Sequence, residues 1–329
     1  MRKTLFIATA ALTILLSGSA HAVVSQPAFP DNSKQPQNFW ASGYQAKWIN
    51  QTSAHTDDEY FDVHPGDQLF VEATFQNTGD VEWFGSVSNP CISIYKDPRV
   101  TSSWTGKDTY GSNNYGTSEF QDPLWNSQYN LDCKTEGDAQ KGGFMQFILV
   151  FSIPENAPTG SFREDITMSA GNYWVASVPE TADPIGAAHI WVGLHITPRA
   201  AAEKPRLIVP MEANQDISKL ISLEYDKSTW LLNKYGTLEN TRIPECVVNT
   251  TFSNFGYYGL PTRETAARPV TLSTKKALYK ELYYNYPELM LAYTFPELNN
   301  EAISLSIATN ENDRSCITQA EDVIRSVSF

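Results

Sequence analysis

Short runs in which apolar and polar residues alternate constrain this chain more than any other feature. Residues 68–77 (QLFVEATFQN) are apolar at every second position. This period of two is that of a β-strand with one buried face. Further strands are expected at 144–153, 166–170 and 188–197.

Turn-forming residues separate these strands. Pro65-Gly66, Asn77-Thr78-Gly79 and Pro158-Thr159-Gly160 supply the backbone conformations that tight turns need. Helical periodicity is absent from this half of the sequence. Short alternating strands with such punctuation predict a mainly β protein whose residues 41–198 form an Ig-like β-sandwich.

The second half, residues 207–329, has a mixed pattern that predicts a smaller α+β domain. Residues 220–226 and 230–232 are expected to form a strand pair around a turn, and 247–252 and 303–309 to form further strands. The segment 273–284 fits the start of a short helix and a strand equally well. In 316–329 the residues Ile317, Ala320 and Ile324 stand at helical spacing.

A Pro- and Ala-rich stretch at 199–206 (RAAAEKPR) follows the last strand of the first half, so it is expected to be a linker. Residues 23–40 have few large apolar side chains and are predicted to be a flexible lead-in. The chain between this lead-in and its end is long enough for two domains of ordinary size.

The first 22 residues have the pattern of a cleavable secretory signal peptide. Arg2 and Lys3 precede an apolar run of about 12 residues, and small residues at Ala20 and Ala22 fit a cleavage site. The run is too short to span a bilayer as a helix. We therefore expect a secreted protein without an integral membrane segment after cleavage.

The charge of the chain is acidic. Removing Arg2 and Lys3 leaves 22 basic residues against 37 acidic ones, a net charge of −15. An acidic surface repels the phosphate backbone, so nucleic acid is excluded as a partner.

Four cysteines remain after export, and they are expected to form disulfides. Four cysteines allow three pairings. If each half folds alone, the pairs are Cys91–Cys133 and Cys246–Cys316. No C-x-x-C spacing occurs, so a zinc site is disfavoured.

An ordered set of Trp, Gly, Asn and Pro positions runs through 41–198. Its members are Trp48, Pro65, Gly66, Asn77, Gly79, Trp83, Gly160 and Trp174. In this order they resemble the NBR1-type Ig-like FW (four-tryptophan) domain, bacterial versions of which occur in exported proteins. The resemblance implies recognition of a protein or of the cell-envelope surface. The bulky Trp83 and Trp174 fit the core of a sandwich.

A stretch of about 50 residues, 92–142, departs from that family pattern. It mixes aromatic residues with Gly, Ser, Asn and Thr, a composition found in binding loops. The candidate binding residues are Trp104, Tyr110, Tyr115 and Trp125. The alternative is that these rings pack the insertion onto the sandwich.

The second half contains Tyr225-Asp226, Trp230, Cys246 and a closing segment from Cys316 to Phe329. This pattern resembles small exported domains of the Mog1/PsbP-like fold, which are α+β.

Patterns typical of catalysis are missing from the sequence. It has no G-x-S-x-G, no S-x-x-K and no H-E-x-x-H. His189 and His195 share one strand face beside Trp191, but six residues of strand separate them by about 20 Å, too far to share an ion. We therefore predict no catalytic residues, no metal and no cofactor.

Together these features predict a non-enzymatic, exported binding protein that recognises a protein or a cell-envelope component. The alternative is an accessory module that binds glycan or peptidoglycan through the aromatic insertion. A hydrolase would need a site assembled from scattered acidic residues.

Overall fold

The computed structural model describes residues 40–51, 60–84, 92–96, 118–125, 130–133, 138–170, 173–177, 189–210, 220–233, 236–250, 261–284, 288–295, 303–310 and 313–329. Within these ranges the chain is mainly β, as predicted, and has one helix. The predicted signal peptide at 1–22 and almost all of the predicted lead-in lie outside them.

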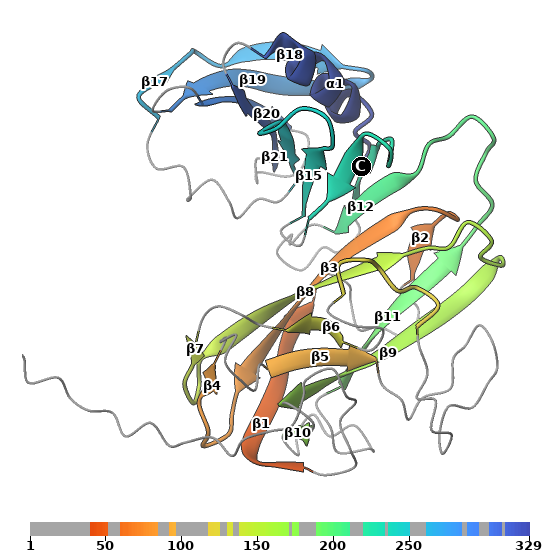
Figure 1. The fold of residues 1–329 in the computed structure, drawn as a ribbon, viewed down its shortest axis with the longest axis vertical. Coiled ribbons are helices and arrows are strands. Elements are labelled where there is room, and N and C mark those ends of the chain that lie inside the picture. Colours follow the sequence, from red (N-terminus) through yellow and green to blue (C-terminus); the bar gives the residue numbers. More distant parts are fainter. Residues whose placement is uncertain are drawn as a thin grey trace, which may run out of the picture.

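Strands of the first half fold around one hydrophobic cluster (Figure 1). They are β1 (Trp40–Gln51), β2 (Phe61–Val63), β3 (Gln68–Asn77), β5 (Ile92–Lys96), β6 (Asn130–Cys133), β8 (Phe144–Ser152), β9 (Gly160–Ala170), β10 (Tyr173–Ser177) and β11 (His189–Ile196). Their order is β3-β1-β10-β9-β11-β2; in addition β8 pairs with β3, and β5 pairs with β6 and β9. The short strands β4 (Trp83–Phe84) and β7 (Asp138–Ala139) form a separate pair. This arrangement is consistent with the predicted β-sandwich.

The alternation in β3 has the predicted result. Leu69, Val71, Ala73 and Phe75 are fully buried in the first hydrophobic cluster. Phe70, on the opposite side of the strand, is also buried, because it packs in a second cluster with residues of the other half of the chain.

Asn77 and Gly79 explain the turn that follows β3. The Asn77 side chain donates to the carbonyl oxygens of Val81 and Ala139, both at 2.8 Å, and its Oδ1 accepts from the Gly79 N–H at 3.0 Å. A Cβ at Gly79 would lie 2.2 Å from the carbonyl oxygen of Gly43, so only glycine fits.

The structure also describes the backbone or the packing of other residues of the FW-like pattern. Gly66 and Gly160 have positive φ, Trp48 packs against the first hydrophobic cluster, and Trp83 is fully buried in it. Trp174 lies in β10, but its side chain is outside the described part of the structure.

Strands of the second half form an antiparallel sheet in the order β14-β15-β16-β21-β20-β19-β17, with β18 also paired to β19. They are β14 (Trp230–Leu232), β15 (Thr237–Asn240), β16 (Val247–Asn249), β17 (Arg263–Glu264), β18 (Arg268–Leu272), β19 (Lys275–Tyr283), β20 (Glu288–Phe295) and β21 (Ile303–Asn310). Figure 1 shows this sheet above the first one, with the helix α1 (Arg314–Arg325) beside it.

Helix α1 confirms the helix that residue spacing in 316–329 predicts. It buries Cys316, Ala320 and Ile324, and the Asp313 side chain caps its first turn by accepting from the backbone N–H of Ser315 and Cys316. The predicted Cys246–Cys316 disulfide is present and joins the helix to the loop before β16. The pair Cys91–Cys133 stays a prediction, because Cys91 lies outside the described residues.

The structure decides one secondary-structure assignment that the sequence left open and corrects one predicted strand pairing. The segment 273–284 forms strand β19 rather than a helix; Ser273 adopts a positive φ of 53° in the turn that precedes it. The expected pairing of 220–226 with 230–232 is wrong. Strand β13 (Leu220–Glu224) pairs with β12 (Arg206–Pro210), and β14 pairs with β15.

Strand β12 connects the two halves. It pairs in parallel with β3 through Leu207 and Ile208, so the first strands after residue 205 extend the N-terminal sheet. Leu207 and Val209 share the second hydrophobic cluster with Phe70 and Val150 of that sheet. The division into two domains stays a prediction, but buried side chains and backbone pairing cross its proposed boundary.

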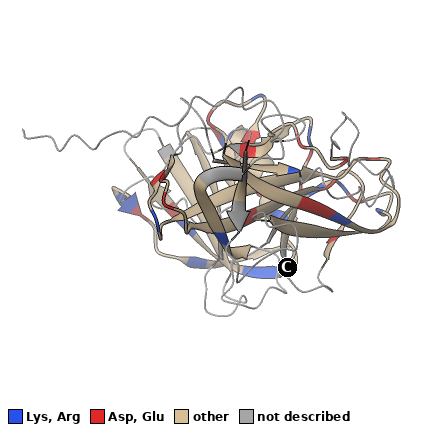
Figure 2. Cartoon of the chain, turned by 90° about the horizontal axis from the view of Figure 1, so that it is seen from below, with Lys and Arg blue, Asp and Glu red and all other residues tan. Residues whose placement is uncertain are grey.

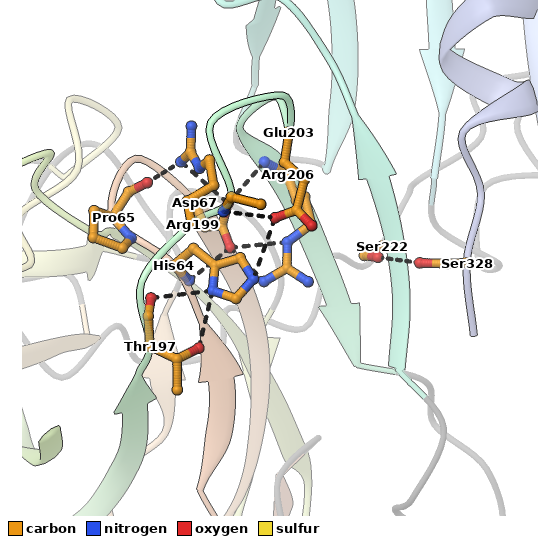
Figure 3. A network of polar contacts seen from close by, with 10 residues as sticks. His64, Pro65, Asp67, Thr197, Arg199, Glu203, Arg206, Ser222 and Ser328 are labelled. Atoms are coloured by element: carbon orange, nitrogen blue, oxygen red, sulfur yellow. Dashed lines mark hydrogen bonds and ion pairs between the residues drawn. The ribbon is translucent and has the colours of Figure 1, made fainter. Parts of the chain in front are cut away.

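A polar network around Asp67 holds the predicted linker 199–206 in place (Figure 3). The Asp67 carboxylate is fully buried and accepts hydrogen bonds from the Arg206 side chain and from the Arg206 backbone N–H. Arg199 donates to the Pro65 carbonyl oxygen and lies 3.5 Å from Asp67. His64 contacts the backbone and side chain of Thr197 at 3.2 and 3.1 Å. The linker is therefore fastened to the turn between β2 and β3.

Candidate functional site

The predicted binding residues of the insertion divide into two groups. Trp104, Tyr110 and Tyr115 lie outside the described residues. Trp125 is buried, donates its indole N–H to the Val150 carbonyl oxygen, and meets the Phe151 ring edge-on at 6.0 Å. Trp125 therefore packs this part of the insertion onto the sandwich, which favours the packing alternative for this ring.

The outward side of β9 and β11 holds the histidines that the sequence singled out. His189 Nε2 lies 3.0 Å from Asp165 Oδ1, whereas His195 Nδ1 lies 3.0 Å from the Ser161 hydroxyl. The two histidines thus have separate partners on β9. Among the described residues, no group of three or more His, Cys, Asp or Glu side chains is placed to hold a metal.

Asp165 forms ion pairs with both Arg163 and His189 on the outward side of these strands. Burial alone would raise the pKa of its carboxyl, but hydrogen bonds from His189 and Arg163 outweigh burial and lower it. The Arg163 guanidinium also lies over the Trp191 ring, 4.9 Å from its centroid. Arg163 is therefore already paired with an acid and a ring, which leaves it poorly suited to capture a charged partner.

A different surface combines exposed charge with fixed aromatic rings. It lies at the β17–β18–β19 end of the second sheet, and we call it the Tyr–Arg face. Its members are Arg263, Arg268, Tyr279, Glu281 and Tyr283.

Strand geometry brings these five residues together. Tyr279, Glu281 and Tyr283 occupy alternate positions of β19, so they project from one side of the sheet. Arg263 is the cross-strand neighbour of Tyr283, and Arg268 is that of Tyr279. Directly opposed residues in an antiparallel pair place their side chains on the same side.

Each arginine stacks on its cross-strand tyrosine. The Arg263 guanidinium carbon lies 3.7 Å from the centroid of the Tyr283 ring, and that of Arg268 lies 4.8 Å from the Tyr279 ring. Both distances fall within the range of cation–π attraction. The rings therefore hold two exposed guanidinium groups in fixed positions.

Glu281 fixes the rings in turn. Its two carboxylate oxygens accept from the hydroxyls of Tyr279, at 2.8 Å, and Tyr283, at 2.7 Å. These two hydrogen bonds lower the pKa of Glu281, Tyr283 contributing most. Burial, and then the bond to Glu281, raises the pKa of Tyr279. At neutral pH Glu281 is therefore a carboxylate and Tyr279 a neutral phenol.

The face is also tied to helix α1. The Tyr279 and Tyr293 ring centroids are 5.2 Å apart, and the Tyr293 hydroxyl donates to Glu321 at 3.2 Å. Arg325 donates to the same carboxylate at 2.9 Å. The position of Tyr279 thus depends on packing against both the next strand and the helix.

Charge on the face differs from that of the chain as a whole. Although the chain has a net charge of −13, neither Arg263 nor Arg268 forms an ion pair with a carboxylate of the described residues. The neighbouring Glu264 pairs with Lys280 at 2.5 Å instead. In Figure 2 basic and acidic segments are scattered over the described part of the chain.

The edge of the sheet beside this face is poorly suited to adding another strand. Strand β17 has two residues, and Pro269 in β18 has no backbone N–H to donate. The side chains, rather than the backbone edge, are therefore what this surface offers to a partner.

Sequence reasoning missed the Tyr–Arg face. The sequence contains the alternation Tyr279-x-Glu281-x-Tyr283, but its pattern fits a helix and a strand equally well. Only a strand places the three side chains on one side. The two arginines become their neighbours through pairing that the sequence does not specify.

No protein-family model matches this chain, and no curated protein sequence matches it. The resemblances to the FW and Mog1/PsbP-like domains therefore stay predictions. No helix of the described residues is both long and apolar enough to cross a membrane.

Proposed function

We propose that this chain is an exported, non-enzymatic binding protein that contacts a partner protein through the Tyr–Arg face. The observation that carries the proposal is the stacking of exposed Arg263 and Arg268 on tyrosines held by Glu281. Tyrosine and arginine are enriched among the residues that dominate binding energy at protein interfaces.

Preorganisation supports the same proposal. A long arginine side chain normally loses rotamer freedom when it binds, and this loss opposes association. The Tyr283 and Tyr279 rings already restrict the two guanidinium groups, so less freedom is lost when a partner docks. Unpaired positive charge further favours a partner whose contact surface presents carboxylates.

Export and the recognition of a protein or envelope surface rest on the signal-like residues 1–22 and on the FW resemblance. The alternative, a glycan- or peptidoglycan-binding module, rested on the aromatic insertion. Burial of Trp125 removes one of its four rings. We therefore favour a protein partner over a glycan.

The test compares two double variants with equal changes in charge. Arg263→Ala/Arg268→Ala alters the face, and Arg242→Ala/Arg314→Ala removes two exposed arginines elsewhere. Each immobilised mature protein is incubated with cell-envelope extract of the producing cell, and retained proteins are quantified by mass spectrometry. We expect at least one protein that the wild type and the control variant retain and the face variant loses.

Binding to the purified candidate partner then completes the test, and raised salt should weaken it because the contact relies on charge. Equal retention by both double variants would contradict the proposal. Retention that survives proteolysis of the extract but not treatment with glycosidases would favour the glycan alternative.

A further inference from the structure

Lys96 and Glu164 meet inside the N-terminal sandwich. Lys96 is the last residue of β5, and Glu164 lies on the neighbouring strand β9, where Lys96 is paired with Ile166. Lys96 Nζ lies 3.0 Å from Glu164 Oε1, and each side chain exposes only 2% of its surface.

The period of two explains why both charges point inward. Lys96 is on the same side of β5 as Ile92 and Ile94, and Glu164 is on the same side of β9 as Phe162 and Ile166. These four apolar neighbours belong to the first hydrophobic cluster. The amine and the carboxyl group therefore meet in an apolar, water-excluded environment.

The surroundings do little to stabilise the ionic forms. Within the described structure, Lys96 Nζ and Glu164 Oε1 contact each other, and neither atom has a further hydrogen-bond partner. Burial raises the pKa of the Glu164 carboxyl, and this effect exceeds the opposing influence of Lys96 and of the hydrogen bond from Ser118. Burying two charged groups in contact carries a large desolvation cost, which any reaction that removes both charges would relieve.

We propose that Lys96 and Glu164 are joined by an isopeptide bond that forms spontaneously once the sandwich has folded. The Lys96 ammonium first gives a proton to the Glu164 carboxylate. The nitrogen lone pair then attacks Cδ of Glu164, one hydrogen moves from the nitrogen to the hydroxyl oxygen of the acid, and the bond from Cδ to that oxygen breaks so that it leaves as water. The product is a neutral amide in which the nitrogen keeps one hydrogen.

Three features of the site favour this reaction without any co-reactant. Contact in a folded core makes the step effectively intramolecular, which raises its rate strongly. A desolvated lysine amine is a competent nucleophile. The Ser118 hydroxyl, hydrogen-bonded to the carboxyl group, stabilises negative charge that develops on its oxygen during attack.

The bond has a structural consequence at the start of the insertion. Lys96 is the last described residue before the segment 97–117 of the aromatic insertion. An amide to Glu164 fixes that point of the chain to β9 and replaces two buried charges by one neutral group.

Two other lysine–carboxylate ion pairs among the described residues provide internal controls. Lys141 lies 2.7 Å from Asp80, and Lys280 lies 2.5 Å from Glu264, so both pairs are closer than Lys96 and Glu164. Their side chains are exposed, from 34% to 84%. Water solvates these exposed groups, and we expect no bond between them.

The experiment is mass spectrometry of the purified full-length mature protein after reduction and denaturation. We expect its mass to be lower than calculated by one molecule of water. Peptide mapping should recover a branched peptide that contains Lys96 and Glu164, whereas Lys141, Asp80, Lys280 and Glu264 should appear in unbranched peptides. Lys96→Arg retains the positive charge but lacks the amine, and it should have its calculated mass.

The wild-type measurement decides the proposal, whether or not the variant folds. Recovery of Lys96 and Glu164 in separate unbranched peptides from folded wild-type protein would overturn it. Loss of water at one of the exposed pairs instead would overturn the role assigned to burial.

Discussion

Arg206 donates hydrogen bonds from Nε and Nη2 to a single oxygen of Asp67, Oδ2, at 3.0 and 2.7 Å. Its backbone N–H donates to the other oxygen, Oδ1, at 2.9 Å. One fully buried carboxylate thus joins the beginning of β3 to the beginning of β12. The two strands are neighbours in the sheet although about 140 residues separate them in sequence.

This relationship predicts a large effect of Asp67→Ala on stability. The substitution leaves the guanidinium of Arg206 in a largely buried position without its acid. We expect the free energy of unfolding to fall by about 3 kcal/mol, measured by urea denaturation. Asp80→Ala, which removes an exposed ion pair, serves as the control and should leave the denaturation midpoint unchanged. Equal midpoints for both variants would show that the Asp67 network does not stabilise the junction.

Trp125→Ala tests whether the part of the insertion around Trp125 is packed onto the sandwich. The indole is buried against Phe151, so its removal creates a cavity and should destabilise the protein by about 3–5 kcal/mol. Phe144→Ala removes a ring that is 59% exposed and should have little effect on the thermal midpoint. A Trp125→Ala protein as stable as the wild type, with a weakened affinity for a ligand, would instead favour the binding interpretation.

Removal of the Cys246–Cys316 disulfide should also be costly. The bond links residues 70 positions apart, and in the chain-entropy model it disfavours the unfolded chain by about 4 kcal/mol. We expect Cys246→Ala/Cys316→Ala to lower the urea midpoint by a corresponding amount. Peptide mapping without reductant should recover Cys246 with Cys316 from the wild type; recovery of Cys246 with Cys91 would contradict this pairing.

We expect the ionisation of Asp165 to contribute to the loss of folding stability at acid pH. Its carboxyl has a lowered pKa in the folded state, so it favours folding when it is ionised. As the pH falls below about 4, the unfolded chain takes up a proton more readily at this position than the folded protein does. The stability contributed by Asp165 should therefore be present at neutral pH and be lost at acid pH.

The measurement is the free energy of unfolding of the wild type and of Asp165→Asn between pH 7 and pH 3. We expect Asp165→Asn to be less stable than the wild type at neutral pH, with the difference shrinking as the pH falls. A difference that stays constant with pH would mean that Asp165 acts through packing rather than through its charge.

Much of the local structure was predictable from the sequence. The alternation in 68–77 gave strand β3 with the correct inward residues, and the spacing of Ala320 and Ile324 gave helix α1. These features follow from one residue and its near neighbours, because the periods of strands and helices are local properties. The Cys246–Cys316 pair could also be predicted, since each half of the chain holds two cysteines.

Strand partners were harder to predict. Residues 220–224 and 230–232 were both recognised as strands, but each pairs with a different neighbour from the one expected. A period of two identifies which side of a strand is buried, whereas it does not select the strand beside it. The same limit hid the Tyr–Arg face, where Arg263 and Arg268 reach β19 only through pairing.

The sequence by itself determined that this chain forms mainly β-strands, ends in an amphipathic helix and has its cysteines placed for disulfides. These results depend on local periodicity and on residue type. Only the tertiary structure decided that Lys96 meets Glu164 in the core, that Asp67 fastens the linker, and that two arginines stack on tyrosines at one end of a sheet. Each of these contacts joins residues from different strands, and it forms only when packing of the hydrophobic clusters fixes how those strands are arranged.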